Sequence, residues 1–156
     1  MKKFITVMFI LFWTLTCSIY CQIAVGYNTD GNTLCISTNP LHQFSGEFRV
    51  NTKAYNQASW SYTDRGITQA YLIFNLFSSK NVTLYLGGGV GVNSLSEGSD
   101  KWLSVNIPVG LKMNPFATLP NFFLVGEYDP MIITSDDTPI IHSVSLGFRY
   151  ILSRKE

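Results

Sequence analysis

The chain has 156 residues, of which 46% are hydrophobic, 14% aromatic and 13% charged. Ordinary globular domains carry about 25% charged residues, so the charged fraction here is roughly half of the usual one. This composition argues against a disordered chain, which combines low hydrophobicity with high charge. The formal net charge is +1 and no cluster of basic residues is present, which argues against a nucleic-acid-binding protein. The length is that of one domain.

Residues 1–21 have the organisation of a secretory signal peptide. Lys2 and Lys3 precede an apolar stretch at 4–15, and a more polar segment follows. The apolar stretch is shorter than the roughly 20 residues that a transmembrane helix needs. We predict cleavage before Gln22, which leaves a mature chain of 135 residues with a net charge of −1.

The cysteines support an exported domain at 22–156 that has no internal disulfide. Acylation of Cys17 or Cys21, as in a lipoprotein, is disfavoured because the residues before each of them match the lipoprotein signal poorly. Cleavage leaves only Cys35, and one cysteine cannot form an internal bridge. Insertion in a membrane would supply the stability that disulfides give to other exported domains.

The remaining chain alternates between apolar and polar residues with a period of two, which predicts β-strands. The pattern is clearest at 103–113, where every second residue from Leu103 to Met113 is apolar. No stretch of 18 apolar residues follows the signal peptide, so no transmembrane helix is expected. Eight segments show the alternation: 23–28, 33–38, 44–52, 67–77, 82–92, 103–113, 122–131 and 142–152.

Short and long connections alternate along the chain. The short or proline-rich turns are 38–43, 78–81 and 114–121. The longer polar loops are 53–66, 93–102 and 132–139. The hairpin signal at Asp30-Gly31 is a short connection on the long-loop side. Short turns at one end of a barrel and longer loops at the other are the arrangement of bacterial outer-membrane barrels.

The polar face of the strands decides which side of the predicted barrel is the interior. It is rich in small residues, which suit the cramped interior of an eight-stranded barrel. Its glycines are Gly26, Gly87, Gly89, Gly91, Gly110 and Gly147. Its charged residues nearly balance, and they are Glu47, Arg49, Lys112, Glu127, Asp129 and Arg149. We predict that these charges form a buried network, since buried charges must be paired. The alternative is a set of solvated charges on a soluble sheet.

Aromatic residues fall near both ends of the predicted strands. Phe44, Phe122 and Tyr150 lie near the short turns, and Trp102 and Tyr128 lie near the long loops. Two such groups resemble the aromatic girdles of membrane barrels. Ordinary enrichment of aromatic residues in strands is the alternative explanation.

The last strand resembles the C-terminal β-signal that the outer-membrane assembly machinery recognises. The resemblance lies in Gly147, Phe148, Tyr150 and Leu152, which have the spacing of that signal. The chain departs from the usual form because residues 153–156 follow, whereas many such proteins end on an aromatic residue.

Taken together, these features resemble the small OmpA/OmpX-like outer-membrane barrels, and the Gln22 start resembles exported proteins of Bacteroidetes-type bacteria. The resemblance implies an all-β fold, an eight-stranded antiparallel up-and-down transmembrane β-barrel. It also implies a place in the outer membrane of a Gram-negative bacterium. The expected partners are the lipid of that membrane and, during insertion, the assembly machinery.

Residues with catalytic or metal-binding chemistry are few. His42 and His142 lie far apart in sequence and have no cysteine at ligand spacing, so no metal site or other cofactor is expected. A lipid-modifying hydrolase would need a histidine and a serine on one face of the sheet. His142 and Ser143 are adjacent and point to opposite faces, and Ser145 fails the same test.

The sequence therefore predicts a non-enzymatic membrane barrel with a structural or surface-interaction role. The network of charges, with Tyr85, should plug the interior, so that the protein does not conduct like a large porin. Trp60, Tyr62 and Trp102 are the candidate contacts of the outer loops with an extracellular ligand. Two other classes stay open, an outer-membrane lipid-modifying enzyme and a soluble, lipocalin-like barrel with an apolar pocket.

Overall fold

The computed structural model describes residues 22–51, 54–56, 61–63, 67–93, 103–134 and 140–152. The predicted signal peptide and the loop residues Trp60 and Trp102 lie outside these ranges. None of the helical structure in the described ranges is long and apolar enough to cross a membrane. The described elements are β1 (Ile23–Asn28), η1 (Asp30–Asn32), β2 (Thr33–Thr38), β3 (Phe44–Asn51), β4 (Ala54–Asn56), β5 (Ser61–Thr63), β6 (Ile67–Ser78), β7 (Val82–Val92), β8 (Leu103–Asn106), β9 (Val109–Met113), β10 (Phe122–Thr134) and β11 (Ile140–Ile151).

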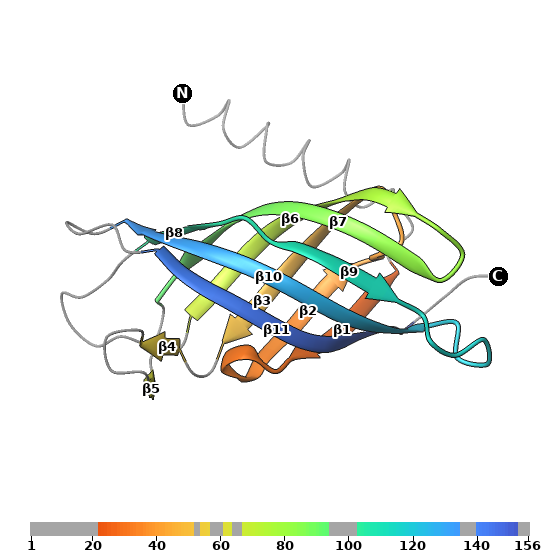
Figure 1. Cartoon of the computed structure of the whole chain (residues 1–156), viewed down its shortest axis with the longest axis horizontal. Coiled ribbons are helices and arrows are strands. Elements are labelled where there is room, and N and C mark those ends of the chain that lie inside the picture. The colour runs from red at the N-terminus through yellow and green to blue at the C-terminus, as the bar shows by residue number, and fades with distance from the viewer. Residues whose placement is uncertain are drawn as a thin grey trace, which may run out of the picture.

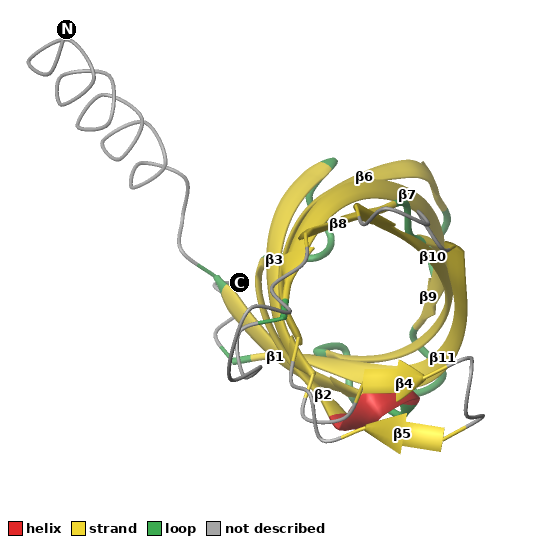
Figure 2. Ribbon diagram, turned by 90° about the vertical axis from the view of Figure 1, so that its left-hand side faces the viewer, coloured by secondary structure: helices red, strands yellow, loops and turns green. Residues whose placement is uncertain are grey.

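The strands close into a barrel, seen end-on in Figure 2. Each strand pairs antiparallel with its neighbour from β1 through β3, β6 and β7 to β10 and β11, and β11 pairs with β1. The pieces β8 and β9 both lie between β7 and β10 and form one strand of the wall. The prediction of an eight-stranded antiparallel barrel is confirmed.

The predicted strand at 103–113 is interrupted at Ile107 and Pro108, between β8 and β9. Proline has no N–H to donate to the ladder. The neighbouring strands bridge the gap: Gly87 N donates to Pro108 O at 2.7 Å, and Ile107 N donates to Pro130 O at 3.2 Å. The wall therefore continues past the interruption.

Two predicted loops contain more strand than the sequence indicated. The predicted loop 132–139 is too long, because β10 continues to Thr134 and β11 starts at Ile140. Met131 and Ile133 continue the alternation with buried side chains. Within 53–66, β4 and β5 form a separate antiparallel pair with Tyr55 opposite Tyr62, beyond the loop end of the barrel at the left of Figure 1.

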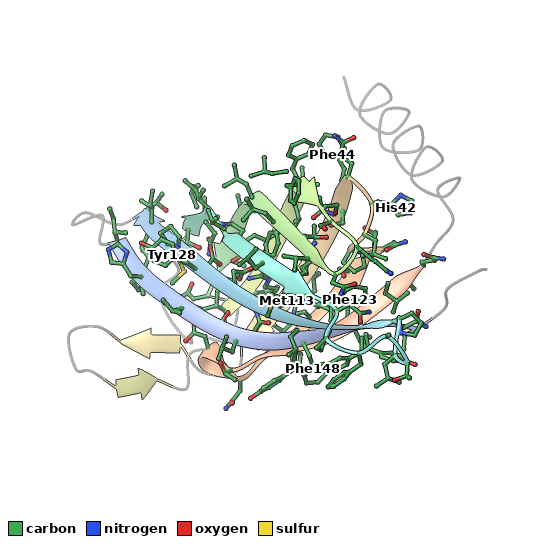
Figure 3. The ribbon with its side chains drawn as sticks, turned by 45° about the vertical axis from the view of Figure 1, so that its right-hand side comes forward. His42, Phe44, Met113, Phe123, Tyr128 and Phe148 are labelled. Atoms are coloured by element: carbon green, nitrogen blue, oxygen red, sulfur yellow. The ribbon has the colours of Figure 1, made fainter. Side chains whose placement is uncertain are left out.

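The two faces of the wall differ sharply in composition. The outward face is apolar, and Figure 3 shows Phe44 and Phe148 projecting from it. Leu72 and Val144 are each 75% exposed there. The inward face carries the buried charged and amide side chains. The surface that faces away from the core is thus the hydrophobic one.

Candidate functional site

The centre of the barrel interior, or lumen, is organised around Arg49 on β3. Its Nε donates to Glu47 Oε1 at 2.5 Å. Its Nη1 and Nη2 donate to Glu127 Oε1 and Oε2 on β10 at 2.5 and 2.7 Å. The three side chains are almost fully buried. The contact between Arg49 and Glu127 is bidentate and joins β3 to β10 across the lumen. Bidentate arginine–carboxylate pairs are stronger and more specific in geometry than single hydrogen bonds.

A second arginine, Arg149, extends the network to the seam where the barrel closes. Arg149 lies on β11, and its Nη2 donates to Glu47 Oε1 at 2.7 Å while its Nε donates to Oε2 at 3.2 Å. Its Nη1 donates to Asn28 Oδ1 on β1 at 2.7 Å. Glu47 is therefore shared by two guanidinium groups, and one side chain connects β11 with β1 and β3.

Two tyrosines donate further hydrogen bonds to the carboxylates, and an amide supports one of the tyrosines. Tyr85 OH donates to Glu127 Oε2 at 2.6 Å. Tyr71 OH donates to Asp129 Oδ2 at 2.5 Å and accepts from Asn106 Nδ2 at 2.9 Å. Asp129 Oδ2 also lies 3.7 Å from Arg49 Nη1. Its other oxygen, Oδ1, is buried and has no hydrogen-bond partner among the described residues.

Lys112 is the predicted network member that the structure keeps apart from the carboxylates. Its Nζ donates to Pro40 O at 3.0 Å and to Asn75 Oδ1 at 3.1 Å, and it lies 4.6 Å from the centre of the Tyr85 ring. Within the described part of the chain, Lys112 Nζ makes no ion pair with a carboxylate. The structure thus joins five of the six predicted charges and places the sixth near the turn that contains Pro40.

The inward glycines make room for these long side chains. Gly26 lies opposite Arg149 in the strand register, and a Cβ on it would collide with the Arg149 side chain. Gly110 lies opposite Tyr85, and a Cβ there would lie 2.5 Å from the Tyr85 hydroxyl. Each glycine therefore supplies the space that its large neighbour occupies. Glycine opposite a long polar residue is a signal that sequence analysis could have used.

The predicted lumen set leaves out several residues that complete the interior. Asn28, Tyr71 and Asn106 form hydrogen bonds within the network, and Asn75 accepts from the separate Lys112. The interior also holds three apolar clusters, so the expectation of a uniformly polar inward face is incomplete. These clusters are Ile67, Met131 and Ile133; Tyr71, Ile73, Tyr85 and Val125; and Ala24, Phe123 and Ile151.

The histidines and serine considered for catalysis do not contact one another. His142 faces outward, where its Nδ1 lies 2.6 Å from Tyr128 OH and its ring stacks on that tyrosine. Ser143 Oγ donates instead to Asp30 Oδ2. His42 is exposed in the turn before β3. The described residues hold no group of three potential metal ligands.

The residues of the predicted β-signal lie on β11 and just after it. Phe148, Tyr150 and Leu152 are exposed on the outward face. Gly147 lies opposite Asn28, and a Cβ on it would meet that side chain. Of the loop contact candidates, only the backbone of Tyr62 falls within the described residues, in β5.

Comparison with known proteins supports the fold. No family model and no curated protein matches the chain. Among solved structures, the N-terminal β-barrel domain of Pseudomonas aeruginosa OprF is similar with a TM-score of 0.54 and 15% sequence identity, over 83% of this chain and 96% of that one. The Yersinia pestis outer membrane protein Ail gives a TM-score of 0.45 and 21% identity over the same shares. At this identity, the likeness to the OprF domain identifies the fold of the chain, a small antiparallel β-barrel.

Proposed function

We propose that the protein is a small integral outer-membrane β-barrel with a plugged lumen and a structural or surface-interaction role. The observation that carries this proposal is the inversion of the two faces. Charged side chains are buried inside the barrel, and large apolar side chains cover its outside. A soluble barrel would expose such apolar residues to water, whereas a membrane barrel presents them to lipid.

The outward apolar residues run around the whole wall. They occur on every wall strand described, which is what a lipid-facing band requires. The most exposed members are Leu34, Ile36, Phe44, Leu72, Leu76, Phe77, Val90, Val144, Leu146 and Leu152. Soluble monomers commonly expose only isolated apolar residues or a single apolar patch of about a few hundred Å², and not a band that runs around the molecule.

The content of the lumen argues against the two alternative functions. A lipocalin-like barrel needs an apolar pocket, but the middle of this interior is occupied by the ion pairs of Arg49 and Arg149. A lipid-modifying hydrolase needs an activated serine, but Ser143 and His142 point to opposite sides of β11. We therefore propose a non-enzymatic protein whose outer loops, with Trp60, Tyr62 and Trp102, contact an extracellular ligand.

We also propose how the barrel reaches the membrane. The segment at 1–21 would direct export and then be removed. Phe148, Tyr150 and Leu152 project from the strand that closes the barrel, where the assembly machinery would find them during insertion. Lipid then surrounds the outward face.

The proposal is tested by fractionation and heat-modifiable migration. Membrane and osmotic-shock fractions of expressing cells are run on an SDS gel with and without boiling. We expect the protein in the membrane fraction, with a faster-migrating unboiled band that shifts on heating. Appearance in the shock fluid without a shift would overturn the proposal in favour of a soluble barrel.

Replacing Leu72 with lysine should separate a lipid-facing surface from a water-facing one. Leu72 lies in the middle of β6 and is 75% exposed. A lysine facing lipid should lower the free energy of unfolding in vesicles by about 2 kcal/mol. Urea unfolding in vesicles is the measurement. On a water-facing surface, the same change would leave stability within about 0.5 kcal/mol.

The plugged lumen predicts a barrel without an open pore. The described lumen contains three acidic and three basic side chains, all buried, from Glu47 to Arg149. In planar bilayers, the folded protein should show no steady ionic current at moderate voltage. Steady channels of porin size would contradict the plugged interior while leaving the membrane location intact.

A further inference from the structure

The turn between β9 and β10, residues 114–121, presents apolar side chains at the end of the barrel where the connections are short. It contains no charged residue. Phe116 is 49% exposed and Leu119 is 51% exposed. In Figure 1 the turn projects beyond the wall at the end opposite to β4 and β5. We call it the β9–β10 turn.

The two other short turns present polar residues to their surroundings. In the turn 38–43, Leu41 packs inward on an apolar cluster of the lumen, and the neighbouring His42 is exposed. The turn 78–81 consists of polar residues, with Lys80 exposed among them. Exposed apolar side chains are therefore a particular feature of the β9–β10 turn and not a general property of this end of the barrel.

The β9–β10 turn is ordered by its own hydrogen bonds. The side chain of Asn114 donates from Nδ2 to Leu119 O and Pro120 O, both at 3.2 Å. Its Oδ1 accepts from Phe116 N at 3.2 Å. Leu119 N donates to Phe116 O at 3.1 Å, and Phe122 N donates to Leu119 O at 3.1 Å. Peptide groups that are bonded within the turn can approach lipid at a lower cost than open ones.

A row of aromatic rings joins the β9–β10 turn to the outward face of the wall. The ring centre of Phe116 lies 6.1 Å from that of Phe122, at the start of β10. Phe122 stacks on Phe148 of β11 at 6.0 Å, and Phe148 lies 6.3 Å from Tyr27 of β1. The apolar surface of the turn is thus continuous with the outward face of three wall strands.

We propose that the β9–β10 turn inserts Phe116 and Leu119 into the adjacent membrane leaflet, at the boundary between lipid headgroups and acyl chains. The proposal rests on the membrane location proposed above, which makes the outward face of the wall a lipid contact. Apolar residues of interfacial segments are buried about 5–10 Å into that boundary. The turn has no charged side chain, whose transfer into lipid would be costly.

The size of the exposed surface favours lipid over a protein partner at this turn. A phenylalanine side chain buries at most about 150–250 Å², so half-exposed Phe116 and Leu119 together offer on the order of 200 Å². A stable protein–protein interface buries about 800 Å² on each partner. Lipid needs no such minimum area, because it already surrounds the wall that the turn continues.

The test places a nitroxide spin label at the exposed Thr118, between the two apolar residues, in folded protein in phosphatidylcholine vesicles. EPR power saturation compares collisions of the label with oxygen, which concentrates in lipid, and with a water-soluble nickel chelate. Labels at Leu72→Cys and Ser79→Cys are the references for the outward wall and for the polar turn. We expect the oxygen-to-nickel ratio at Thr118→Cys to exceed that at Ser79→Cys by about threefold or more.

Replacing both Phe116 and Leu119 with serine should return the ratio at Thr118→Cys to the Ser79→Cys value. The native Cys35 is 2% exposed, and labelling of the unsubstituted protein measures its contribution. The heat-modifiable band verifies that each labelled variant is folded.

Three results would overturn the proposal. A ratio at Thr118→Cys equal to that at Ser79→Cys would place the turn in water. Few collisions with either reagent would show that protein covers the turn. A high ratio that persists after both serine substitutions would show that Phe116 and Leu119 do not insert the turn.

The Leu72→Cys label separates this inference from the proposed function. A lipid-like ratio at Leu72→Cys with a water-like ratio at Thr118→Cys would reject insertion of the turn alone. Water-like ratios at both positions would reject the membrane location and the insertion together.

Discussion

Replacing Arg49 with methionine is expected to lower the free energy of unfolding by about 3–5 kcal/mol. Arg49 is the one partner that contacts both Glu47 and Glu127 in the described lumen, through three hydrogen bonds of 2.5 to 2.7 Å. Methionine has a similar length but cannot compensate either carboxylate. The change would leave Glu127 buried, with the Tyr85 hydroxyl as its remaining hydrogen-bond donor among the described side chains.

The measurement is the urea concentration at which the heat-modifiable band is lost in lipid vesicles. Two variants make the result specific. Lys112→Met removes a buried cation that has no carboxylate partner among the described residues, so a smaller loss of about 2 kcal/mol is expected. Adding Glu127→Gln to Arg49→Met removes one uncompensated buried charge and should restore part of the stability. Equal effects of Arg49→Met and Lys112→Met would contradict the central role of the ion pairs.

The strands could be predicted from sequence because one physical pattern repeats in all of them. Alternation with a period of two recovers 23–28, 33–38 and 82–92 with the observed bounds. The same alternation assigns Glu47 and Arg49 to the inward face, since residues two apart share a face of a strand. Membership in the lumen is thus a local property, and local spacing suffices to predict it.

The partners within the lumen depend on the register and tilt of distant strands, which local spacing does not contain. Arg49 reaches Glu127, which lies 78 positions further along the chain. Lys112 also faces inward from its strand. It lies at the end of the barrel near Pro40, however, and donates to the Pro40 carbonyl. A rule that assigns only polar residues to the interior also misses the inward apolar residues, such as Ile73 and Ile133.

Replacing Gly26 with valine is expected to prevent stable closure of the barrel. A Cβ at Gly26 would collide with Arg149 Cδ and with Phe148 O, and it would lie 2.9 Å from Arg149 Nη1. The backbone of β11 is fixed by its pairing with β1, so the arginine would have to leave its place. Moving it breaks the contacts with Glu47 and Asn28. Overpacking and the loss of a buried ion pair together should cost about 4 kcal/mol or more.

Gly88→Val is the matched control, because the outward Gly88 has nothing within 4 Å of an added Cβ. Glycine weakens a strand by about 0.5–1 kcal/mol relative to residues with side chains, so Gly88→Val should be neutral or stabilising. The fraction of unboiled protein that migrates as the folded band reports both variants. If Gly26→Val folds as well as Gly88→Val, Arg149 does not need the space over Gly26, and the seam closes through its backbone ladder alone. The opposite result would show that the seam needs the space over Gly26, which the Arg149 side chain and the Phe148 carbonyl border.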